Sequence, residues 1–236
     1  MPKILLVQNE TREEAGSLRH ILLERKIAFE QVDLSKGQQY PDPRSYSAII
    51  VFGGPDSAND DTEKMEMELA RNKEAVDAGV PFLGICLGLQ SLVKSAGGEV
   101  VRNPVKEIGI KDAEGRYYEI ELTEEGKKDP LFRGCGSTMR VFHLHGETVV
   151  PTHGMRLLAI GKHCVNQVVK VGSRAYGIQG HFELDDEMFE EWVRNDPDLR
   201  KIDSPQFRSE YEKVKGEYLA NCNKIFGNFL SIAGLK

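Results

Sequence analysis

Residues 81–98 read PFLGICLGLQSLVKSAGG. An apolar run typical of a buried parallel strand ends at Cys86, and helix-forming residues follow at once. Gly84 and Gly88 lie two residues to either side of the cysteine, which is the pattern of a nucleophile at a sharp strand-to-helix turn. Small residues are needed there because Cβ atoms would collide at so tight a corner. The stretch therefore predicts a strand, a turn that presents a thiol above the sheet edge, and a helix.

The same alternation of strand and helix patterns surrounds this stretch. Apolar runs predict strands at Lys3–Gln8, Ala28–Asp33, Ala48–Phe52 and Pro81–Ile85. Helices are predicted to start at the capping-box pattern Thr11–Glu14 and to cover Asp61–Ala78, with Gly79 as a stop signal, and Leu87–Ala96. Strands and helices that alternate at these lengths indicate βαβ units and a parallel sheet.

Beyond Gly98 the pattern indicates antiparallel strands. The strand-like stretches are Arg116–Leu122, Thr138–Phe142, Arg156–Ile160, Val165–Val171 and Ala175–Gln179, with a hairpin turn at Val171–Arg174. From Asp185 the sequence is helical, and apolar residues recur every three or four positions from Phe207 to Phe229. We therefore expect an α/β fold of the flavodoxin-like kind, an open and mostly parallel sheet flanked by helices, with antiparallel additions. One domain over residues 1–236 is the simplest organisation, with a core to about 190 and a helical C-terminal extension over about 191–236.

Composition is that of an ordinary globular chain. Of the 236 residues, 40% are apolar and 29% are charged. The net charge is −6 and no basic block is present, so charge gives no reason to expect nucleic-acid or membrane binding. The N-terminal residues lack the apolar region of a signal peptide, and no apolar stretch reaches about 18 residues. The four cysteines are widely spaced without a CxxC pair, which favours reduced thiols in the cytoplasm.

Cys86 is the strongest candidate for chemistry. Its backbone would begin a helix, where free N–H groups favour negative charge, so we expect the sulfur to be held as the reactive thiolate. The N–H of Leu87 would point toward an oxyanion formed on a carbonyl that Cys86 attacks. A free cysteine is more often a small buried core residue. We adopt that interpretation for the other three, Cys135, Cys164 and Cys222.

A nucleophile needs a base, and His181 is placed to supply one. It follows a predicted strand and would lie on the same rim as Cys86 if that strand joins the sheet. Glu183 could accept the other imidazole N–H and so fix the tautomer. After the third strand, Gly53 and Gly54 let the backbone approach a ligand closely, and the Gly54 N–H could be a second oxyanion donor.

These elements, in this order, resemble a known protein family. A strand is followed by GGPxS at 53–57, then by GxCxGxQ at 84–90 and a distal QxHxE at 179–183. Further matches are EIG at 107–109, DPLF at 129–132, and residues 141–147, where the family has W-x-S-H-x-D. Together they resemble the class I, triad-type glutamine amidotransferases, most closely the glutaminase domain of GMP synthase, over roughly residues 3–190.

The resemblance implies three sets of roles. The triad of nucleophile, acid-base and orienting partner would be Cys86, His181 and Glu183. The oxyanion hole would be formed by Gly54 and Leu87. The substrate would be contacted by Gly53, Gln90, Leu144 and His145. The implied reaction is thiolate attack on the side-chain amide of glutamine, release of ammonia and hydrolysis of a γ-glutamyl thioester, without a cofactor.

The sequence departs from the family pattern beside the predicted base. Phe182 replaces a proline, and Gly180 stands where the family has an aromatic or large apolar residue, so we expect a looser pocket that admits something larger than glutamine. In the stretch at 141–147, Phe142, Leu144 and Glu147 replace Trp, Ser and Asp. No synthetase-type SGGxDS loop is present, so an ammonia acceptor would be a separate synthetase polypeptide.

Three other functions are alternatives to that of a stand-alone glutaminase or amidotransferase subunit. A γ-glutamyl peptidase or hydrolase would use the same triad on γ-glutamyl peptides or thiol conjugates. DJ-1/PfpI-like proteins share the elbow cysteine and carry an acidic partner near the first strand, for which Glu10 is the candidate, but the distal His-x-Glu argues against them. A binding protein without turnover would not need an intact triad.

The sequence gives little information on metal binding and on the oligomeric state. His143, His145, His153 and His163 lie close in sequence, but their spacing matches no zinc site, so we expect no metal and take His145 as a site-lining residue. The apolar stripe of the C-terminal helix fits packing on its own domain and is also compatible with a homodimer.

Overall fold

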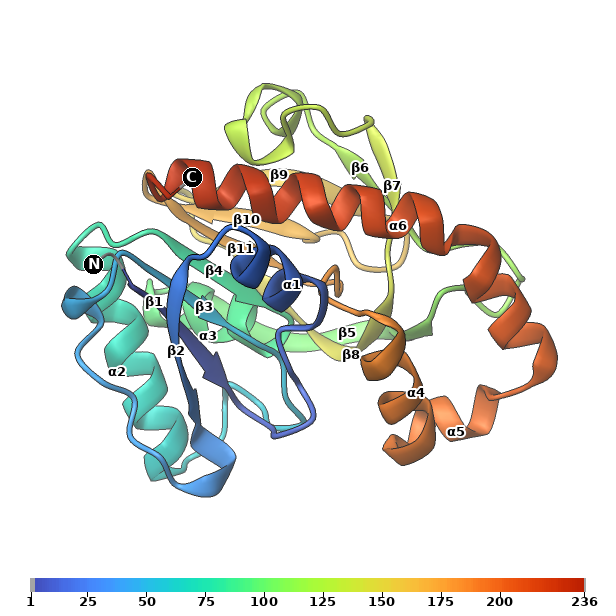
Figure 1. Ribbon diagram of the computed structural model, residues 1–236, viewed down its shortest axis with the longest axis horizontal. Coiled ribbons are helices and arrows are strands. Elements are labelled where there is room, and N and C mark those ends of the chain that lie inside the picture. Colours follow the sequence, from blue (N-terminus) through green and yellow to red (C-terminus); the bar gives the residue numbers. More distant parts are fainter. Residues whose placement is uncertain (1–2, 236) are drawn as a thin grey trace.

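The computed structural model describes residues 3–235, and within that range the chain forms a nine-stranded mixed sheet. The parallel half consists of β1 (Lys3–Gln8), β2 (Ala28–Asp33), β3 (Ala48–Val51), β4 (Phe82–Ile85) and β11 (Ala175–Ile178). The antiparallel half consists of β6 (Glu119–Leu122), β7 (Thr138–Arg140), β9 (Arg156–Gly161) and β10 (Val168–Val171). The order across the sheet is β2-β1-β3-β4-β11-β10-β9-β6-β7 (Figure 1).

The parallel strands β1, β3, β4 and β11 lie where the sequence predicts them because their apolar runs are buried on both faces, whereas the edge strand β2 is partly exposed. Alternate side chains of β1 enter different cores: Ile4 and Leu6 pack in one hydrophobic cluster, and Leu5 and Val7 pack in the other. The predicted hairpin also forms, with Gly172 at φ 60° in the turn between β10 and β11. The expected open, mostly parallel core with antiparallel additions is confirmed.

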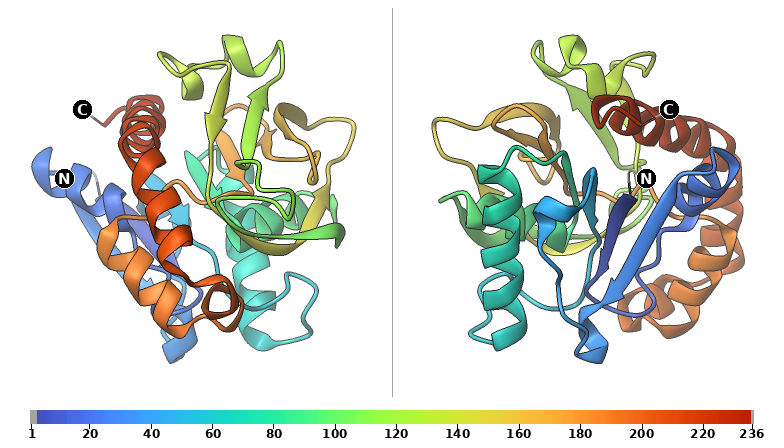
Figure 2. Two further views of the ribbon diagram at one scale, coloured as in Figure 1. Left: turned by 90° about the vertical axis from the view of Figure 1, so that its right-hand side faces the viewer. Right: turned by 60° about the vertical axis from the view of Figure 1, so that its left-hand side comes forward.

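Helices cover both faces of the sheet. One face carries α1 (Gly16–Glu24), α4 (Asp186–Asn195), α5 (Pro197–Ile202) and α6 (Pro205–Ile232). The other carries α2 (Glu63–Asp77) and α3 (Leu87–Ser95). Figure 2 shows α2 and α6 on opposite sides of the parallel strands. Single-turn 3-10 helices occur at Leu34–Lys36, Pro43–Ser45, Gly126–Lys128 and Pro130–Phe132.

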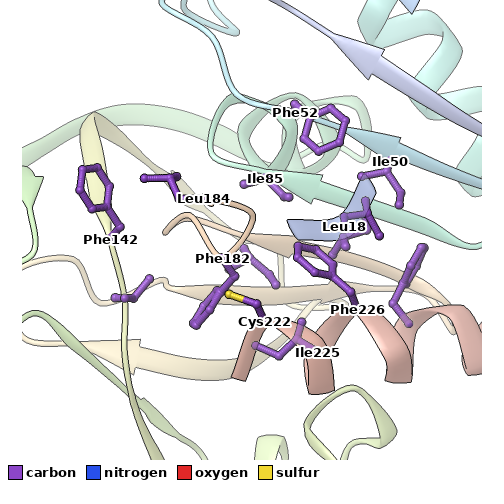
Figure 3. Close-up of a cluster of buried hydrophobic side chains, with 14 of the residues drawn as sticks. Leu18, Ile50, Phe52, Ile85, Phe142, Phe182, Leu184, Cys222, Ile225 and Phe226 are labelled. Atoms are coloured by element: carbon purple, nitrogen blue, oxygen red, sulfur yellow. The ribbon is translucent and has the colours of Figure 1, made fainter. Parts of the chain in front are cut away.

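The C-terminal helix α6 packs into the core that it shares with α1. Its buried residues include Tyr218, Cys222 and Phe226. Figure 3 shows Phe226 of α6 and Leu18 of α1 in one cluster with Phe182. The predicted amphipathic C-terminal helix is therefore confirmed, and it packs against the segment that carries the predicted base. Within residues 3–235 no helix has both the length and the apolar character needed to cross a bilayer.

The predicted helix start at Thr11–Glu14 is wrong. The helix α1 begins at Gly16, and no side chain caps it. The Thr11 hydroxyl instead donates to the Asp33 carboxylate at the end of β2, at 2.6 Å. Gly16 has φ 41°, and a Cβ there would lie 2.0 Å from the Glu183 carbonyl oxygen. The loop after β1 is thus used for long-range contacts in place of a local cap.

The sequence analysis missed a two-stranded ribbon formed by β5 (Glu99–Gly109) and β8 (His143–Val150). Both segments are rich in polar residues, and the pairing register is interrupted between Arg102 and Glu107, around Pro104. Because proline cannot donate to a strand ladder, its presence argues against a strand when the sequence is considered locally. Pairing with a distant segment overrides that local signal.

Candidate active site

Cys86 lies between β4 and α3 in a strained backbone conformation. Its φ is 53° and its ψ is −107°, a region that residues other than glycine rarely adopt. A Cβ at Gly84 would lie 2.1 Å from the Gly88 carbonyl oxygen, and a Cβ at Gly88 would lie 2.2 Å from that of Val51. The N–H of Cys86 donates to the Ile178 carbonyl at 2.8 Å, which ties the turn to β11. The tight turn expected from the two glycines is present.

His181 and Glu183 follow β11, the strand next to β4. Ile178 lies opposite Ile85 in the parallel register, so the chain after β11 emerges at the same sheet edge as Cys86. His181 Nδ1 lies 2.6 Å from Glu183 Oε1, and both side chains are buried. Since the carboxylate accepts, Nδ1 donates to it and the other ring nitrogen is left for the cysteine. The structure brings the three predicted triad residues together.

The electrostatics of His181 suit a thiolate–imidazolium pair. Burial alone would lower the pKa of His181, but the charge of Glu183 and the charge and hydrogen bond of Cys86 outweigh it and hold that pKa well above its usual value. The Trp192 ring packs edge-on against the imidazole, with ring centroids 4.8 Å apart. A fixed imidazolium beside a cysteine can deliver a proton to a leaving nitrogen after the sulfur attacks a carbonyl carbon.

Two buried glutamines lie next to the sulfur, and one of them donates to it. Gln179 Nε2 lies 3.7 Å from Cys86 Sγ, and Gln179 Oε1 accepts from Gln90 Nε2 at 3.4 Å. Gln90 Nε2 also donates to the Glu147 carbonyl at 3.2 Å. The sequence analysis placed Gln90 at the site but missed a role for Gln179, whose only signal was its place in the QxHxE pattern. The structure adds it as a donor to the sulfur.

A cavity of about 480 Å³ opens beside the cysteine. Its wall includes six of the predicted residues, Gly54, Cys86, Gln90, Leu144, His145 and His181. The other three lie behind that wall: Glu183 behind His181, Leu87 at the start of α3, and Gly53 beneath the cysteine, where a Cβ would lie 3.4 Å from Cys86 Cβ. Charged side chains that the sequence analysis did not place there also line the wall, namely the acidic Glu13, Asp56, Glu147, Asp196 and Asp198 and the basic Arg12 and Lys106.

The expected loosening around His181 is not found. A Cβ at Gly180 would lie 2.3 Å from Val141 Cγ2 and 2.9 Å from His143 Cε1, so neighbouring side chains fill the space that a larger residue would take. Phe182 is buried and stacks on Tyr218, with centroids 6.0 Å apart. These departures from the family pattern change what packs behind His181 and do not widen the cavity.

The acidic residue from the first loop that reaches the site is Glu13, not Glu10. Glu10 is partly exposed and lines a separate surface hollow, whereas Glu13 is buried and lines the catalytic cavity. Burial raises the pKa of Glu13 to about 7. No sequence feature distinguishes Glu13 from its acidic neighbours, so local sequence reasoning points to the wrong carboxyl.

Two buried clusters bring potential metal ligands within 4.8 Å of one another: Glu13 with His181 and Glu183, and Glu107 with His143 and His145. In the second cluster, Glu107 Oε2 lies 2.9 Å from His145 Nε2, and His145 Nδ1 lies 3.0 Å from the Glu147 carbonyl oxygen. A carbonyl only accepts, so Nδ1 donates to it, while Nε2 makes no hydrogen bond within residues 3–235. The sequence analysis missed this cluster because only the β5–β8 pairing assembles it.

Comparisons with known proteins agree with this geometry. The family model described as glutamine amidotransferase class-I matches residues 15–196. The chain is 30% identical over 199 residues to the glutamine amidotransferase-like protein YfeJ of Salmonella typhimurium, covering 82% of this chain and 80% of that protein. It is 26% identical over 173 residues to a subunit of the glutamine-hydrolyzing GMP synthase of Sulfolobus acidocaldarius, covering 72% of this chain and 85% of that subunit. It spans only 24% of the length of the glutamine-hydrolyzing GMP synthase of Lactobacillus acidophilus.

The fold is shared with a crystal structure of a glutamine amidotransferase from Thermotoga maritima. The TM-score is 0.84 over 98% of both chains, and the identity is 24%, so this likeness concerns the fold alone. The family match covers most of the chain, including the turn at Cys86 and the segment of His181. The chain belongs to the class-I glutamine amidotransferase family.

Proposed function

We propose that the protein hydrolyses the side-chain amide of glutamine to glutamate and ammonia. The observation that carries the proposal is the strained turn of Cys86, at φ 53°, beside an imidazole whose Nδ1 lies 2.6 Å from Glu183. The thiolate attacks the amide carbon, and His181 protonates the nitrogen as the C–N bond breaks. Water then attacks the γ-glutamyl thioester while His181 takes its proton, which releases glutamate and restores the thiolate.

The negative oxygen formed in each attack needs donors, and we assign the backbone N–H groups of Gly54 and Leu87 to it. Leu87 begins α3, where N–H groups are free of intrahelical partners. Gly54 lines the cavity, and a Cβ there would lie 2.7 Å from Asn9 Cβ, so a larger residue could not take its place. Gly53, Gln90, Leu144 and His145 are our candidates for holding the amino-acid part of the substrate.

A γ-glutamyl peptidase or hydrolase is the second candidate, and the size of the cavity supports it. The cavity of about 480 Å³ lies within the range of sites that enclose drug-sized ligands, about 300–1,000 Å³. Both reactions pass through the same thioester, so the triad itself favours neither.

Partners and location belong to the same proposal. The relative from Sulfolobus acidocaldarius is named as one subunit of a GMP synthase, which supports a separate synthetase subunit as the ammonia acceptor. A homodimer through the C-terminal helix stays a prediction. All four cysteines are free, and Cys164 and Cys222 are buried as expected, whereas Cys135 is partly exposed. Free thiols support the cytoplasm as the compartment.

The test is covalent labelling with a diazoketone analogue of glutamine, read by peptide mass spectrometry. We expect the label on Cys86, with protection by glutamine for the first candidate and only by γ-glutamyl dipeptides for the second. Cys86→Ala should lose turnover by about 10⁴-fold or more. Cys135→Ala removes a thiol away from the cavity and should label as the wild type does. A protein that resists labelling at Cys86 and turns over neither substrate class would contradict both candidates.

A further inference from the structure

The reaction described above does not use the buried carboxyl of Glu13. We propose that Glu13 is a second carboxylate partner of the catalytic imidazole, which acts with Glu183 to stabilise the imidazolium form of His181. It is a positioning residue, because it acts on His181 and not on the substrate. Only its effect on turnover rests on the proposed function; its effect on His181 does not.

The space beside Gly53 shows how close the groups come. A Cβ built on Gly53 would lie 3.0 Å from Glu13 Oε2, 3.1 Å from His181 Cε1 and 3.4 Å from Cys86 Cβ. A carboxylate oxygen of Glu13, a ring nitrogen of His181 and a carboxylate oxygen of Glu183 also lie within 4.8 Å of one another. Glu183 accepts a hydrogen bond from Nδ1. Glu13 lies on the Cε1 side of the ring, because its Oε2 and His181 Cε1 are both close to the same point beside Gly53. Imidazolium carries its charge across both nitrogens and the carbon between them, so carboxylates on these two sides both stabilise it.

The carboxylate oxygen Oε2 of Glu13 is the reason to assign Glu13 to His181 and not to a bound ligand. Glu13 Oε2 is shielded from solvent and finds no hydrogen-bond donor within residues 3–235. Burial of an ionised carboxylate without a donor is unfavourable. The adjacent imidazolium is a positive charge that can compensate it, whereas the guanidinium of Arg12 lies 3.7 Å from Asp196 and is directed toward that carboxylate.

Hydrogen bonds to backbone carbonyls hold the loop that carries Glu13. Gln8 Nε2 donates to the carbonyl of Glu13 at 3.2 Å. The Glu13 N–H in turn donates to the carbonyl of Glu10 at 3.0 Å. Trp192, whose ring packs on His181, donates from Nε1 to the Arg12 carbonyl at 3.0 Å. The position of the Glu13 carboxyl therefore depends on the same elements that position the imidazole.

The charges around Glu13 determine when it can act. Burial raises the pKa of Glu13 to about 7, the charges of His181 and Arg12 lower it, and those of Glu183 and Glu10 raise it. Below about pH 7, Glu13 is neutral, and His181 is stabilised by Glu183 and Cys86. Above that pH, ionised Glu13 adds a second negative charge and raises the pKa of His181 further. The proton donor for the leaving ammonia then persists to higher pH.

The test follows the Cε1 proton of His181 by NMR across a pH titration of the full chain, labelled with carbon-13 histidine and assigned with His181→Ala. The wild type should show one inflection near pH 7, from Glu13, and another at higher pH from the ring. Glu13→Gln should remove the first inflection and shift the second to lower pH by about 1 unit. Glu14→Gln, which changes an exposed acidic residue of the same loop, should leave both inflections in place.

A Glu13→Gln protein whose His181 titrates as in the wild type overturns the proposal. If Glu13→Gln does not fold, Glu13→Asp keeps the charge on a shorter side chain and should retain a weaker inflection near pH 7; its complete loss with an unshifted His181 overturns the proposal as well. The titration needs no substrate, so it remains decisive even if the protein fails to hydrolyse glutamine. Where turnover is measured, the alkaline limb of kcat should move to lower pH in Glu13→Gln and stay in place in Glu14→Gln.

Discussion

The glycines around Cys86 matter because they lack a Cβ atom. A conformation such as that of Cys86 costs about 1–3 kcal/mol and persists only where its surroundings impose it. Here the N–H of Cys86 donates to Ile178 at 2.8 Å, and its carbonyl accepts from the Gln90 N–H at 3.1 Å. Gly84 and Gly88 let the chain turn closely enough for both bonds to form. The thiol is thereby held at the sheet edge.

We predict that Gly84→Ala destabilises the protein and disrupts the site. The new Cβ would meet the Gly88 carbonyl oxygen at 2.1 Å, and its three nearest atoms all belong to the backbone of Gly88 and Leu89, which cannot move away as a side chain could. The free energy of unfolding, measured with urea, should fall by about 3 kcal/mol, and Cys86 should lose its labelling by the glutamine analogue.

Gly216→Ala is the matched control for this change. Gly216 lies within α6, and within residues 3–235 a Cβ built on it would have no atom within 4 Å apart from its chain neighbours and the adjacent backbone of its own helix. Alanine there should raise stability by about 0.5–1 kcal/mol, because it restricts the unfolded chain and favours the helix. A Gly84→Ala protein as stable and as reactive as the wild type would contradict the tight turn.

At the scale of elements, α6 supports the site although it contributes nothing to the cavity wall. Tyr218 Oη donates to the His181 carbonyl at 2.9 Å and accepts from the Leu184 N–H at 3.2 Å. These two bonds clamp the backbone on both sides of Phe182, which also stacks on the Tyr218 ring. The helix thus fixes the segment that carries His181 and Glu183.

We predict that Tyr218→Phe weakens both stability and turnover. The change leaves a buried carbonyl and a buried N–H without their partner, which should cost about 1–3 kcal/mol, measured by urea unfolding. Tyr211→Phe removes a hydroxyl from the same buried face of α6, but that hydroxyl has no hydrogen-bond partner within the described chain. It should be neutral or slightly stabilising. An equal loss of stability in Tyr218→Phe and Tyr211→Phe would show that α6 acts through packing alone.

The stability of the whole molecule should depend on pH through buried carboxyls. Glu68 is a fully buried residue of α2, and the polar side chains of Ser91 and Asn9 compensate its charge only in part. Burial raises the pKa of Glu68 from 4.5 to about 7. The folded state therefore binds an extra proton between those pH values, so stability falls as the pH rises from about 4.5 to about 7 and levels off above that. The contribution of this one group is about 3 kcal/mol.

We predict that Glu68→Gln matches the wild type near pH 5 and is more stable by up to about 3 kcal/mol at pH 8, because the amide has no charge to bury. Urea unfolding at several pH values measures this difference. Glu66→Gln, an exposed change on the same helix, should show no such dependence. A Glu68→Gln difference that stays constant from pH 5 to 8 would mean that Glu68 does not titrate in this range.

Features that depend on residues close together in the sequence could be predicted from it, and features that depend on contacts between distant segments could not. The parallel strands are apolar runs, the stop of α2 is Gly79 at φ 67°, and the amphipathic α6 carries its own periodicity. All three are local signals. The start of α1 and the β5–β8 ribbon escape local prediction because Thr11 bonds to Asp33, and β5 pairs with β8, across long stretches of chain.

The sequence by itself determined the turn at Cys86 and the nomination of His181 and Glu183, because glycines two residues to either side of a cysteine at the end of an apolar run mark a sharp strand-to-helix turn, and because few residue types can serve as nucleophile, base and orienting acid. Only the tertiary structure decided that Glu13, and not Glu10, faces His181, and that Gln179 donates to the sulfur. Both outcomes depend on hydrogen bonds that join distant segments, such as that from Trp192 to Arg12. Such bonds orient side chains that are locally equivalent in sequence.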